Sequence, residues 1–284
     1  MKTKAPTLRQ FLDRFPNEDA CLEHLMRVRY GDRHDCSKCG RSAHFYRVWA
    51  RKVFSCEYCG NQVSPMVDTP FERTRTPLRD WFHVMFLFCT TRNGVAAKEV
   101  ERQLGVTYKT AWRMCHEIRK YMGEVDGDGP LGGPGKHVEI DETMIGGFRS
   151  PKVVVMGMLE RGGDVKTAVV PNQRKATLTP IIDANVIPGG AVHTDELRSY
   201  LGLHLRGHRH MTVNHSAHEY VGFDGASTNG IEGFWAAVKR GINGTHIHVS
   251  QKHLGKYLAE FEYRWNMRQT PHAMLDRLMV SFAR

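Results

Sequence analysis

The stretch HVEIDETMIGG, residues 137–147, decides the fold of the larger part of this 284-residue chain. Apolar Val138 and Ile140 alternate with acidic Glu139 and Asp141, which is the two-residue period of a β-strand with one apolar face. The segment before it, GEVDGDGPLGGPGK, is rich in glycine and proline and is typical of a linker or domain boundary. We therefore expect a new domain to begin at residue 137, with a strand that carries carboxylates on one face.

The segments after this strand indicate a mixed α/β domain. KVVVMGMLERGGDVKTAVVP (152–171) predicts two strands joined at Arg161-Gly162-Gly163, and ATLTPIIDANV (176–186) predicts a helix. GGAVHTDELRSY (189–200) predicts a short strand ending at Thr194 or Asp195, followed by a helix. Three strands, a helix, a strand, a helix and then a helix carrying an acid is the order of a ribonuclease-H-like α/β fold.

The helix that carries the acid is TNGIEGFWAAVKR, residues 228–240, and SQKHLGKYLAEFEYRWNMR (250–268) predicts a long C-terminal helix after it. Its apolar residues recur with the spacing of an amphipathic helix: Ile231, Phe234, Trp235 and Val238. Glu232 and Lys239 lie two helical turns apart, which is too far for an i, i+4 ion pair. Each side chain is therefore expected to have a different partner.

Three carboxylates can converge in such a fold. If Asp141 ends a central strand and Asp195 ends its neighbour, both emerge at one sheet edge, and a helix packed across the sheet brings Glu232 to the same place. Carboxylates this close repel one another unless a cation lies among them, and hard oxygen ligands favour Mg²⁺ or Mn²⁺. Two such ions, about 3.5–4 Å apart, are the arrangement used for phosphoryl transfer.

Each acid also has a simpler explanation. Glu139 and Glu142 compete with Asp141 for the role of first acid, and either can be a solvated charge. Asp195 suits a helix N-cap. Asn229 as N-cap with Glu232 at the third helical position would form a pair resembling a capping box. On spacing alone these alternatives stay open.

Seven cysteines are present, and four of them form two CxxC pairs: Cys36, Cys39, Cys56 and Cys59. Sixteen residues separate the pairs, and HFYRVWARKVFSC between them alternates as a hairpin does. Four thiolates on two turns suit one tetrahedral Zn²⁺, and a redox dithiol is the alternative. We predict a zinc ribbon. Cys21, Cys89 and Cys115 are expected to be small buried side chains.

The segments around the ribbon are expected to be helical. FPNEDACLEHLMRVRYG predicts a helix capped by Asn17, and LRDWFHVMFLFCTT predicts a buried one. A short helix ending near Leu104, the turn LGVT and a second helix with Ala111, Cys115 and Ile118 inward form a helix-turn-helix pattern. The basic residues of the second helix are candidates for DNA contact: Lys109, Arg113, Arg119 and Lys120. An ordinary helical hairpin with a basic face is the alternative.

Composition favours a polyanionic partner. The chain has 40 Lys and Arg residues against 30 Asp and Glu residues, a net charge of +10 and a pI near 9.3. Nucleic acid fits this balance best. The longest apolar run, VVVMGML, is too short to span a bilayer, and the first residues have no apolar signal region. We therefore expect a cytoplasmic protein with no membrane partner.

Long motifs resemble one known family, the bacterial insertion-sequence transposases of the IS1595 type with an ISXO2-like catalytic domain. The resemblance runs over residues 15–268 through VEIDETMIGG, GMLERGG, VHTDELRSY, VNHSAHEYV and TNGIEGFWAAVKRGINGTHIHVSQKHLGKYLAEFEYRWN. CSKCG and FSCEYCGNQVSPMVDTPFERTRTPLRDWF are similar to its zinc-ribbon region. Two local departures are Met144, where the family pattern suggests an aromatic residue, and Asp68, where it suggests glycine.

The resemblance implies five segments: a helical segment (1–30), a zinc ribbon (31–70), a helix-turn-helix region (71–123), a linker (124–136) and a ribonuclease-H-like catalytic domain (137–284). It implies a DDE transposase in which Asp141, Asp195 and Glu232 hold two Mg²⁺ or Mn²⁺ ions, Lys239 contacts a phosphate and one Zn²⁺ is structural. The implied partner is double-stranded DNA, at the element ends and at the target, with contacts from Lys109, Arg113, Lys239 and Arg240. A homodimer or higher oligomer is expected on the DNA. The expected location is the nucleoid in the cytoplasm of a bacterium.

Two rival functions stay open beside the transposase. A ribonuclease-H-like nuclease would cut DNA without strand transfer, and a DNA-binding regulator would use the ribbon and helices with an inactive core. Five histidines, at positions 204, 208, 210, 215 and 218, match no zinc spacing. Phosphate contacts and core hydrogen bonds are their expected roles, with a place near the active site for His215.

Overall fold

The chain forms two compact units, and each is described by itself below. The structure is a computed structural model that describes residues 4–49, 51–126, 129–146, 151–213, 222 and 225–280. The first unit comprises Met1–Thr91, Ala97–Tyr121 and Gln269–Arg284, and the second comprises Arg92–Ala96 and Met122–Arg268. Among the described residues, no helix has both the length and the apolar character needed to cross a membrane.

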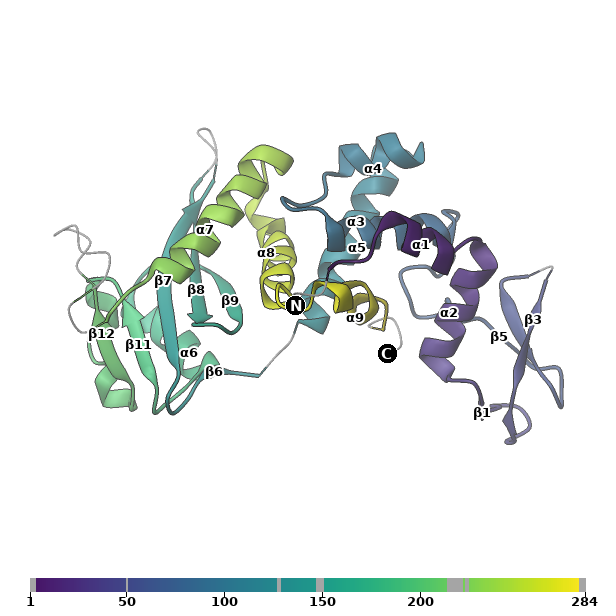
Figure 1. The fold of residues 1–284 in the computed structure, drawn as a ribbon, viewed down its shortest axis with the longest axis horizontal. Helices are drawn as coiled ribbons and strands as arrows, with labels where there is room; N and C mark the ends of the chain where they lie inside the picture. Colours follow the sequence, from purple (N-terminus) through teal and green to yellow (C-terminus); the bar gives the residue numbers. More distant parts are fainter. Residues whose placement is uncertain are drawn as a thin grey trace. The chain divides into compact units, whose positions relative to one another are not determined.

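A five-stranded mixed sheet forms the centre of the second unit, in the order β12-β11-β7-β8-β9 (Figure 1). Its strands are β7 (His137–Ile145), β8 (Val153–Glu160), β9 (Val165–Val170), β11 (Ala191–Thr194) and β12 (Arg209–Thr212). The first three pair antiparallel in sequence, whereas β11 pairs parallel with β7 and β12 parallel with β11. The sheet is mixed and is packed with helices, so the predicted α/β class is confirmed.

Helices cover both faces of this sheet. One core cluster joins the even-numbered side chains of β7 and β8, such as Ile140 and Met158, to α6 (Lys175–Asn185). The other joins odd-numbered side chains, such as Val155, to α7 (Asn229–Gly241) and α8 (Gln251–Asn266). The alternation read from the sequence is therefore the alternation between two buried faces.

Helix α8 also covers the edge of the sheet. Asn266 accepts a hydrogen bond from the backbone N–H of Val165 (2.8 Å) and donates one to the Val165 carbonyl (3.1 Å). One turn earlier, Glu262 accepts from the backbone N–H of Thr167 (3.1 Å) and from its hydroxyl. These side chains occupy backbone groups that an edge strand would otherwise present to another chain.

Two local expectations in this unit are corrected. The stretch after Asp195 was predicted as a helix but forms two single 3₁₀ turns, Arg198–Tyr200 and Leu203–Arg206, because the Asp195 carboxylate accepts the N–H of Leu197 (3.0 Å) and holds a turn. Part of the expected linker forms β6 (Leu131–Gly132), which pairs parallel with β10 (Val186–Ile187). Strand β12 was not predicted at all.

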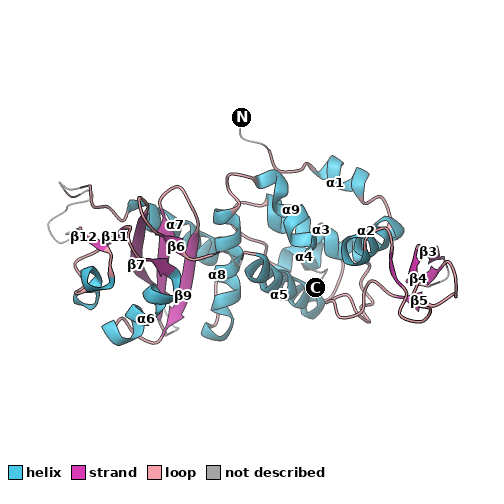
Figure 2. Cartoon of the chain, turned by 90° about the horizontal axis from the view of Figure 1, so that it is seen from below, coloured by secondary structure: helices cyan, strands magenta, loops and turns pink. Residues whose placement is uncertain are grey.

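The first unit consists of helices together with two small sheets (Figure 2), and aromatic side chains such as Phe15, Trp81 and Phe82 are buried among the helices. Its helices are α1 (Leu8–Arg14), α2 (Glu18–Tyr30), α3 (Leu78–Thr90), α4 (Ala97–Leu104), the first part of α5 (Tyr108–Val125) and α9 (Met274–Val280). Asn17 caps α2 as predicted, by accepting from the N–H of Ala20 (2.9 Å). Helix α9, in the stretch where the catalytic domain was expected to end, packs against α3.

The two small sheets form the predicted ribbon. Its short strands are β1 (His34–Asp35), β2 (Ser42–Ala43), β3 (Phe45–Val48), β4 (Val53–Cys56) and β5 (Gln62–Val63). β1 pairs antiparallel with β2, and β3 and β4 form the antiparallel hairpin read from the alternation, with β5 added to β4. Asp68 has a left-handed backbone (φ 59°), a conformation that glycine adopts without strain, which is consistent with the glycine expected at this position.

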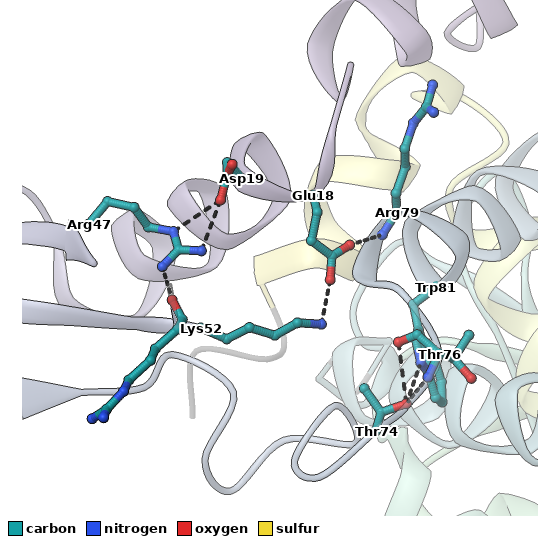
Figure 3. Close-up of polar contacts among 9 residues, drawn as sticks. Glu18, Asp19, Arg47, Lys52, Thr74, Thr76, Arg79 and Trp81 are labelled. Carbon is teal, nitrogen blue, oxygen red and sulfur yellow. Dashed lines mark hydrogen bonds and ion pairs between the residues drawn. The ribbon is translucent and has the colours of Figure 1, made fainter. Parts of the chain in front are cut away.

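Charged side chains tie the ribbon to the helices (Figure 3). Arg47 of β3 donates to the Asp19 carboxylate through Nε (3.1 Å) and Nη2 (2.9 Å). Lys52 donates to Glu18 (2.6 Å), whose second oxygen accepts the backbone N–H of Arg79 at the start of α3 (3.2 Å). Glu18 therefore links the hairpin and α3 to the first turn of α2.

The edge contact of α8 makes stability depend on pH. Burial raises the pKa of Glu262 from 4.5 to about 7, so the folded state holds a proton that the unfolded chain releases near pH 4.5. The free energy of unfolding therefore falls as pH rises from about 4.5 to about 7, by at most roughly 3 kcal/mol. Glu262→Gln keeps an acceptor oxygen for Thr167 without the charge.

We expect Glu262→Gln to be more stable than the wild-type protein at about pH 8 and no more stable at about pH 4.5. Thermal unfolding of both proteins across this range measures the difference. Glu23→Gln, at an exposed position of α2, should leave the pH profile unchanged. Parallel profiles for the wild type and Glu262→Gln would contradict the assignment.

Candidate active site and metal centre

The four cysteines of the ribbon lie on two matching turns. In each turn a glycine N–H donates to the carbonyl of the first cysteine: Gly40 to Cys36 (2.8 Å) and Gly60 to Cys56 (3.1 Å). A bond from the backbone N–H of Cys39 is the largest of the effects that lower the pKa of the Cys36 thiol to about 6, and it favours the thiolate that a metal needs. The repeated CxxCG sequence thus builds the same turn twice.

The sulfur positions fit one tetrahedral ion. All four Sγ atoms lie within 4.8 Å of one another, with Cys36 3.6 Å from Cys59 and Cys39 3.9 Å from Cys56. A tetrahedron with Zn–S bonds of about 2.3 Å requires sulfurs about 3.8 Å apart. A redox dithiol needs only the two cysteines of one CxxC pair to be close together. Here the short distances join cysteines of different pairs, as a shared metal ion requires. The ribbon therefore has a structural zinc site, as predicted.

The three remaining cysteines are buried, as predicted. Cys21 lies in α2, Cys89 in α3 and Cys115 in α5. Burial also raises the pKa of the Cys21 thiol to about 12, so this residue is a neutral core side chain.

Asp141 and Asp195 come from neighbouring strands of the second unit. Parallel pairing aligns Val192 with Val138 and His193 with Glu139, and the same register continued by two residues brings Asp195 beside Asp141. Residues aligned in a parallel pair point to the same face of the sheet. Both carboxylates are half-buried at this place, and Asp195 follows the last residue of β11.

Glu232 lies in the first turn of α7, which runs across β7 and β8 (Figure 1). Its carboxylate accepts a hydrogen bond from the Thr228 hydroxyl (2.9 Å). The capping-box alternative is wrong, because Thr228 and not Asn229 is the N-cap, and the N-cap side chain makes no cap hydrogen bond. Glu232 is half-buried on the helix that faces the Asp141 side of the sheet.

Close packing fixes the height of α7 above the sheet. Gly157 of β8 pairs with Asp141, and a methyl group on Gly157 would lie only 2.4 Å from the Trp235 ring and 2.8 Å from Ile231. Only glycine allows this approach. The bulky face of α7 therefore rests on the strand position next to the first acid.

The structure places the carboxylates on adjoining elements but does not draw them into a tight group. Among the described residues, only the four cysteines form a set of three or more potential ligands that all lie within 4.8 Å. Lys239 and Arg240 lie in the last turn of α7 and are exposed. Lys239 is thus on the same helix as Glu232, two turns toward its C-terminal end.

Glu142 is a further acid that the sequence did not separate from Asp141. Burial raises its pKa to about 7, the charges of Asp195 and Asp141 add to the rise, and a hydrogen bond from the Tyr200 hydroxyl opposes it. Glu142 belongs to the even-numbered face of β7 with Ile140, so it is not on the face of Asp141. Burial is therefore the main cause of the raised pKa, and the nearby charges of Asp195 and Asp141 only add to it.

Glu139 shares the face of Asp141 but is bound differently. It is 3 % exposed, forms an ion pair with Arg161 (2.7 Å) and accepts the backbone N–H of Ile231 (2.9 Å). The alternative that Glu139 is a solvated charge is wrong, because burial excludes it. Strand alternation had already placed it beside Asp141, but no sequence signal showed its partners.

The predicted turn between helices is present in the first unit. Helix α4 ends at Leu104 and α5 begins at Tyr108, with Ala111, Cys115 and Ile118 buried. The side chains of Lys109, Arg113 and Lys120 are exposed, and the Arg113 guanidinium lies 5.3 Å from the centre of the Trp81 ring.

Arg119 is not available to DNA, which corrects the prediction. It is 1 % exposed, and its guanidinium lies 5.1 Å from the centre of the Phe88 ring. Arg119 directly follows Ile118 and lies one turn after Cys115, so it belongs to the inward face of α5. A cation above an aromatic face replaces part of the lost hydration.

The histidines of the second unit form no metal group among the described residues. His210 of β12 lies 2.9 Å from the Thr194 hydroxyl, which is the core hydrogen bond expected for it. His208 is buried, and burial lowers its pKa below 6.5. His204 is exposed. Asn214, His215 and His218 lie outside the described residues.

Two stretches of the chain match models of known domain families, and both families are those of transposases. Residues 120–266 match the ISXO2-like transposase domain, and residues 16–62 match the transposase zinc-ribbon domain. The chain belongs to the ISXO2-like (IS1595) transposase family.

Similar proteins agree with this assignment. An "Uncharacterized transposase-like protein" of Haemophilus influenzae is 40% identical over 110 residues, which cover 36% of this chain and 80% of that protein. An "Uncharacterized protein in transposable element ISH50" of Halobacterium salinarum is 23% identical over 286 residues, 90% of this chain and 94% of that protein. The second match covers both units.

The sulfur geometry predicts that each ribbon cysteine is needed for zinc. Cys36→Ser or Cys59→Ser should reduce the zinc content from about one ion per chain to well below one, and should loosen the ribbon. Elemental analysis measures the zinc, and limited proteolysis measures the loosening. Cys115→Ala, which changes a cysteine buried in α5, should keep the full zinc content. Equal zinc in all three variants would rule out this site.

Proposed function

We propose that this insertion-sequence transposase binds the terminal inverted repeats of its element, then cleaves and joins DNA at a site formed by Asp141, Asp195 and Glu232. The observation that carries the proposal is the parallel register, which brings Asp195 beside Asp141 on the face that α7 covers. The family supplies the reaction class, and the chemistry of three carboxylates supports divalent metal binding.

Asp141, Asp195 and Glu232 would hold two Mg²⁺ or Mn²⁺ ions, which when bound activate a nucleophile and stabilise the leaving oxygen of a phosphodiester. The chain contributes hard oxygen ligands on two strands and one helix, held at a fixed height by the packing of Trp235 on Gly157. Rigid positioning of this kind is the main contribution of a protein to phosphoryl transfer.

The bonds exchanged are phosphodiester bonds only. In cleavage, the oxygen of water bonds to phosphorus, the phosphorus–O3′ bond breaks and a free 3′-OH remains on the element end. In strand transfer, that 3′-OH bonds to a target phosphorus, and the target strand leaves with its own 3′-OH. Lys239, exposed two turns along α7 from Glu232, would hold a phosphate beside the reacting one.

DNA recognition is assigned to the first unit and to the basic end of α7. The exposed face of α5 carries Lys109 and Arg113, and the end of α7 carries Lys239 and Arg240. A net charge of +10 supports binding to a polyanion. Because two element ends must be brought together, we propose a dimer or larger assembly on DNA.

The acids are tested by amide substitution. Asp141→Asn and Asp195→Asn should each reduce Mg²⁺-dependent cleavage of element-end DNA by about 10²–10³-fold or more, because each loses a charged ligand for the same ions. DNA binding without metal should persist in both. Cleavage is measured on labelled element ends, and joined products are measured with a target plasmid.

Asp183→Asn is the matched control, since Asp183 is a partly exposed acid of α6 that pairs with Arg206. It should cleave as the wild type does. Cleavage that survives both active-site changes would refute the proposed site. Cleavage without joined products would identify a nuclease, and binding without cleavage by the wild type would identify a regulator.

The DNA-binding role of α5 is tested by removing charge. Lys109→Ala and Arg113→Ala should each weaken binding to element ends about three- to tenfold and lower the salt slope of binding by about one. Mobility shifts at several salt concentrations measure both quantities. Arg102→Ala, which removes a basic residue paired with Glu99 within α4, is the control. An unchanged salt slope in the α5 variants would assign DNA contact elsewhere.

A further inference from the structure

We propose that Glu139 and Arg161 are positioning residues that anchor the start of α7 to β7 and β11 and thereby place Glu232 opposite Asp141. The inference rests on the proposed function for the role of Glu232. It assigns a task to an ion pair that the reaction itself does not use, in which the Glu139 carboxylate is buried and the Arg161 side chain is partly exposed.

Glu139 supplies a hydrogen-bond acceptor that α7 lacks in its own sequence. The first N–H groups of a helix have no partner within the helix, and a side chain at the N-cap commonly accepts from one of them. Here the side chain of the N-cap Thr228 makes no cap hydrogen bond, and its hydroxyl donates to Glu232. The Ser227 hydroxyl accepts the N–H of Asn229 (3.2 Å), which leaves the N–H of Ile231 without an acceptor from the residues around the helix start. Glu139 of β7 accepts the N–H of Ile231 instead (2.9 Å), and its negative charge lies at the positive end of the helix dipole.

Arg161 completes the anchor from the turn between β8 and β9. Its Nε donates to Glu139 (2.7 Å), and its Nη2 donates to the backbone carbonyl of Ser227, just before the helix (2.9 Å). The backbone N–H of Arg161 donates to the His137 carbonyl at the beginning of β7 (2.9 Å). One side chain therefore holds both the strand carboxylate and the segment that enters α7.

The same group of contacts reaches β11, the strand that ends before Asp195. His193 is completely buried, and its Nδ1 lies 3.4 Å from Arg161 Nη2. Its other ring nitrogen lies 2.9 Å from Nδ1 of His137. The three elements that carry Asp141, Asp195 and Glu232 thus meet at one small polar cluster, two residues along each strand from the acid.

The approach of helix to strand is close enough to exclude any side chain between them. A methyl group on Gly230 would lie 2.8 Å from a Glu139 oxygen and 3.2 Å from Leu159. Gly230 directly precedes the residue whose N–H Glu139 accepts. Since Glu232 is the next residue after Ile231, a shift at this contact moves the third acid directly.

The chain offers a matched control for this ion pair. Glu160 of β8 also pairs with a cation, Lys136 (2.8 Å), and also accepts one backbone N–H, from Gly132 (2.9 Å). It contacts no residue of α7 through these bonds. Glu139→Gln and Glu160→Gln therefore remove the same kind of interaction, but only the first acts on α7.

The test uses the full-length zinc-loaded protein and Mn²⁺ as the probe. We expect Glu139→Gln to weaken Mn²⁺ binding by about tenfold or more, as measured by the electron paramagnetic resonance signal of the free ion. It should also speed amide hydrogen exchange in the first turn of α7. Arg161→Lys keeps the positive charge but loses the second guanidinium nitrogen, which donates to the Ser227 carbonyl. It should therefore give a smaller change in the same direction.

Glu160→Gln should change neither readout, even if it lowers the unfolding temperature. The proposal fails if Glu139→Gln leaves both readouts unchanged, or if Glu160→Gln changes them equally, since the pair then only stabilises the unit. If Glu139→Gln does not fold, Arg161→Lys decides by the same two readouts. Faster exchange in α7 with no Mn²⁺ binding to the wild-type protein would support the anchor and count against the proposed function instead.

Discussion

The parallel pairing of β11 with β7 is the constraint on which the candidate active site depends. Aligned residues of a parallel pair share a face, so this pairing alone brings Asp195 beside Asp141 although a hairpin and a helix separate them in the chain. The pairing requires the crossover through α6, which covers the even-numbered face. The odd-numbered face is then left to α7 and α8, and α7 brings the third acid.

Concentrating carboxylates at one sheet edge has an electrostatic cost, and the structure shows how it is limited. Two of the acids on β7, Glu139 and Glu142, are held by side chains outside the proposed metal site. Glu139 is paired with Arg161, and Glu142 receives the Tyr200 hydroxyl and has a pKa raised toward neutrality. The remaining negative field is that of Asp141, Asp195 and Glu232, which is the charge that divalent cations would neutralise.

The elements with strong local signals were predictable from the sequence. The CxxCG turns, the alternation in β7 and the stripe of α7 each depend on neighbours within a few residues, and all three were confirmed. Strand β12 and the pair β6–β10 were missed because they have only two to four residues and obtain their partners from distant segments. Arg119 was misassigned because charge was weighed above its position on the inward face of α5.

In the candidate site, too, local sequence could not show contacts with distant segments, and Glu139 and Asp141 are the example. Glu139 and Asp141 have the same type of side chain on the same face of one strand, so periodicity cannot assign them different roles. What separates them is where α7 begins: the backbone N–H of Ile231 in its first turn donates to Glu139, and local sequence does not reveal a contact between residues 139 and 231. Once the helix start occupies Glu139, the packing of Trp235 on Gly157 sets the helix over the position paired with Asp141. The proposed choice of Asp141 over Glu139 as the first acid therefore depends on the entry point of a helix about ninety residues away.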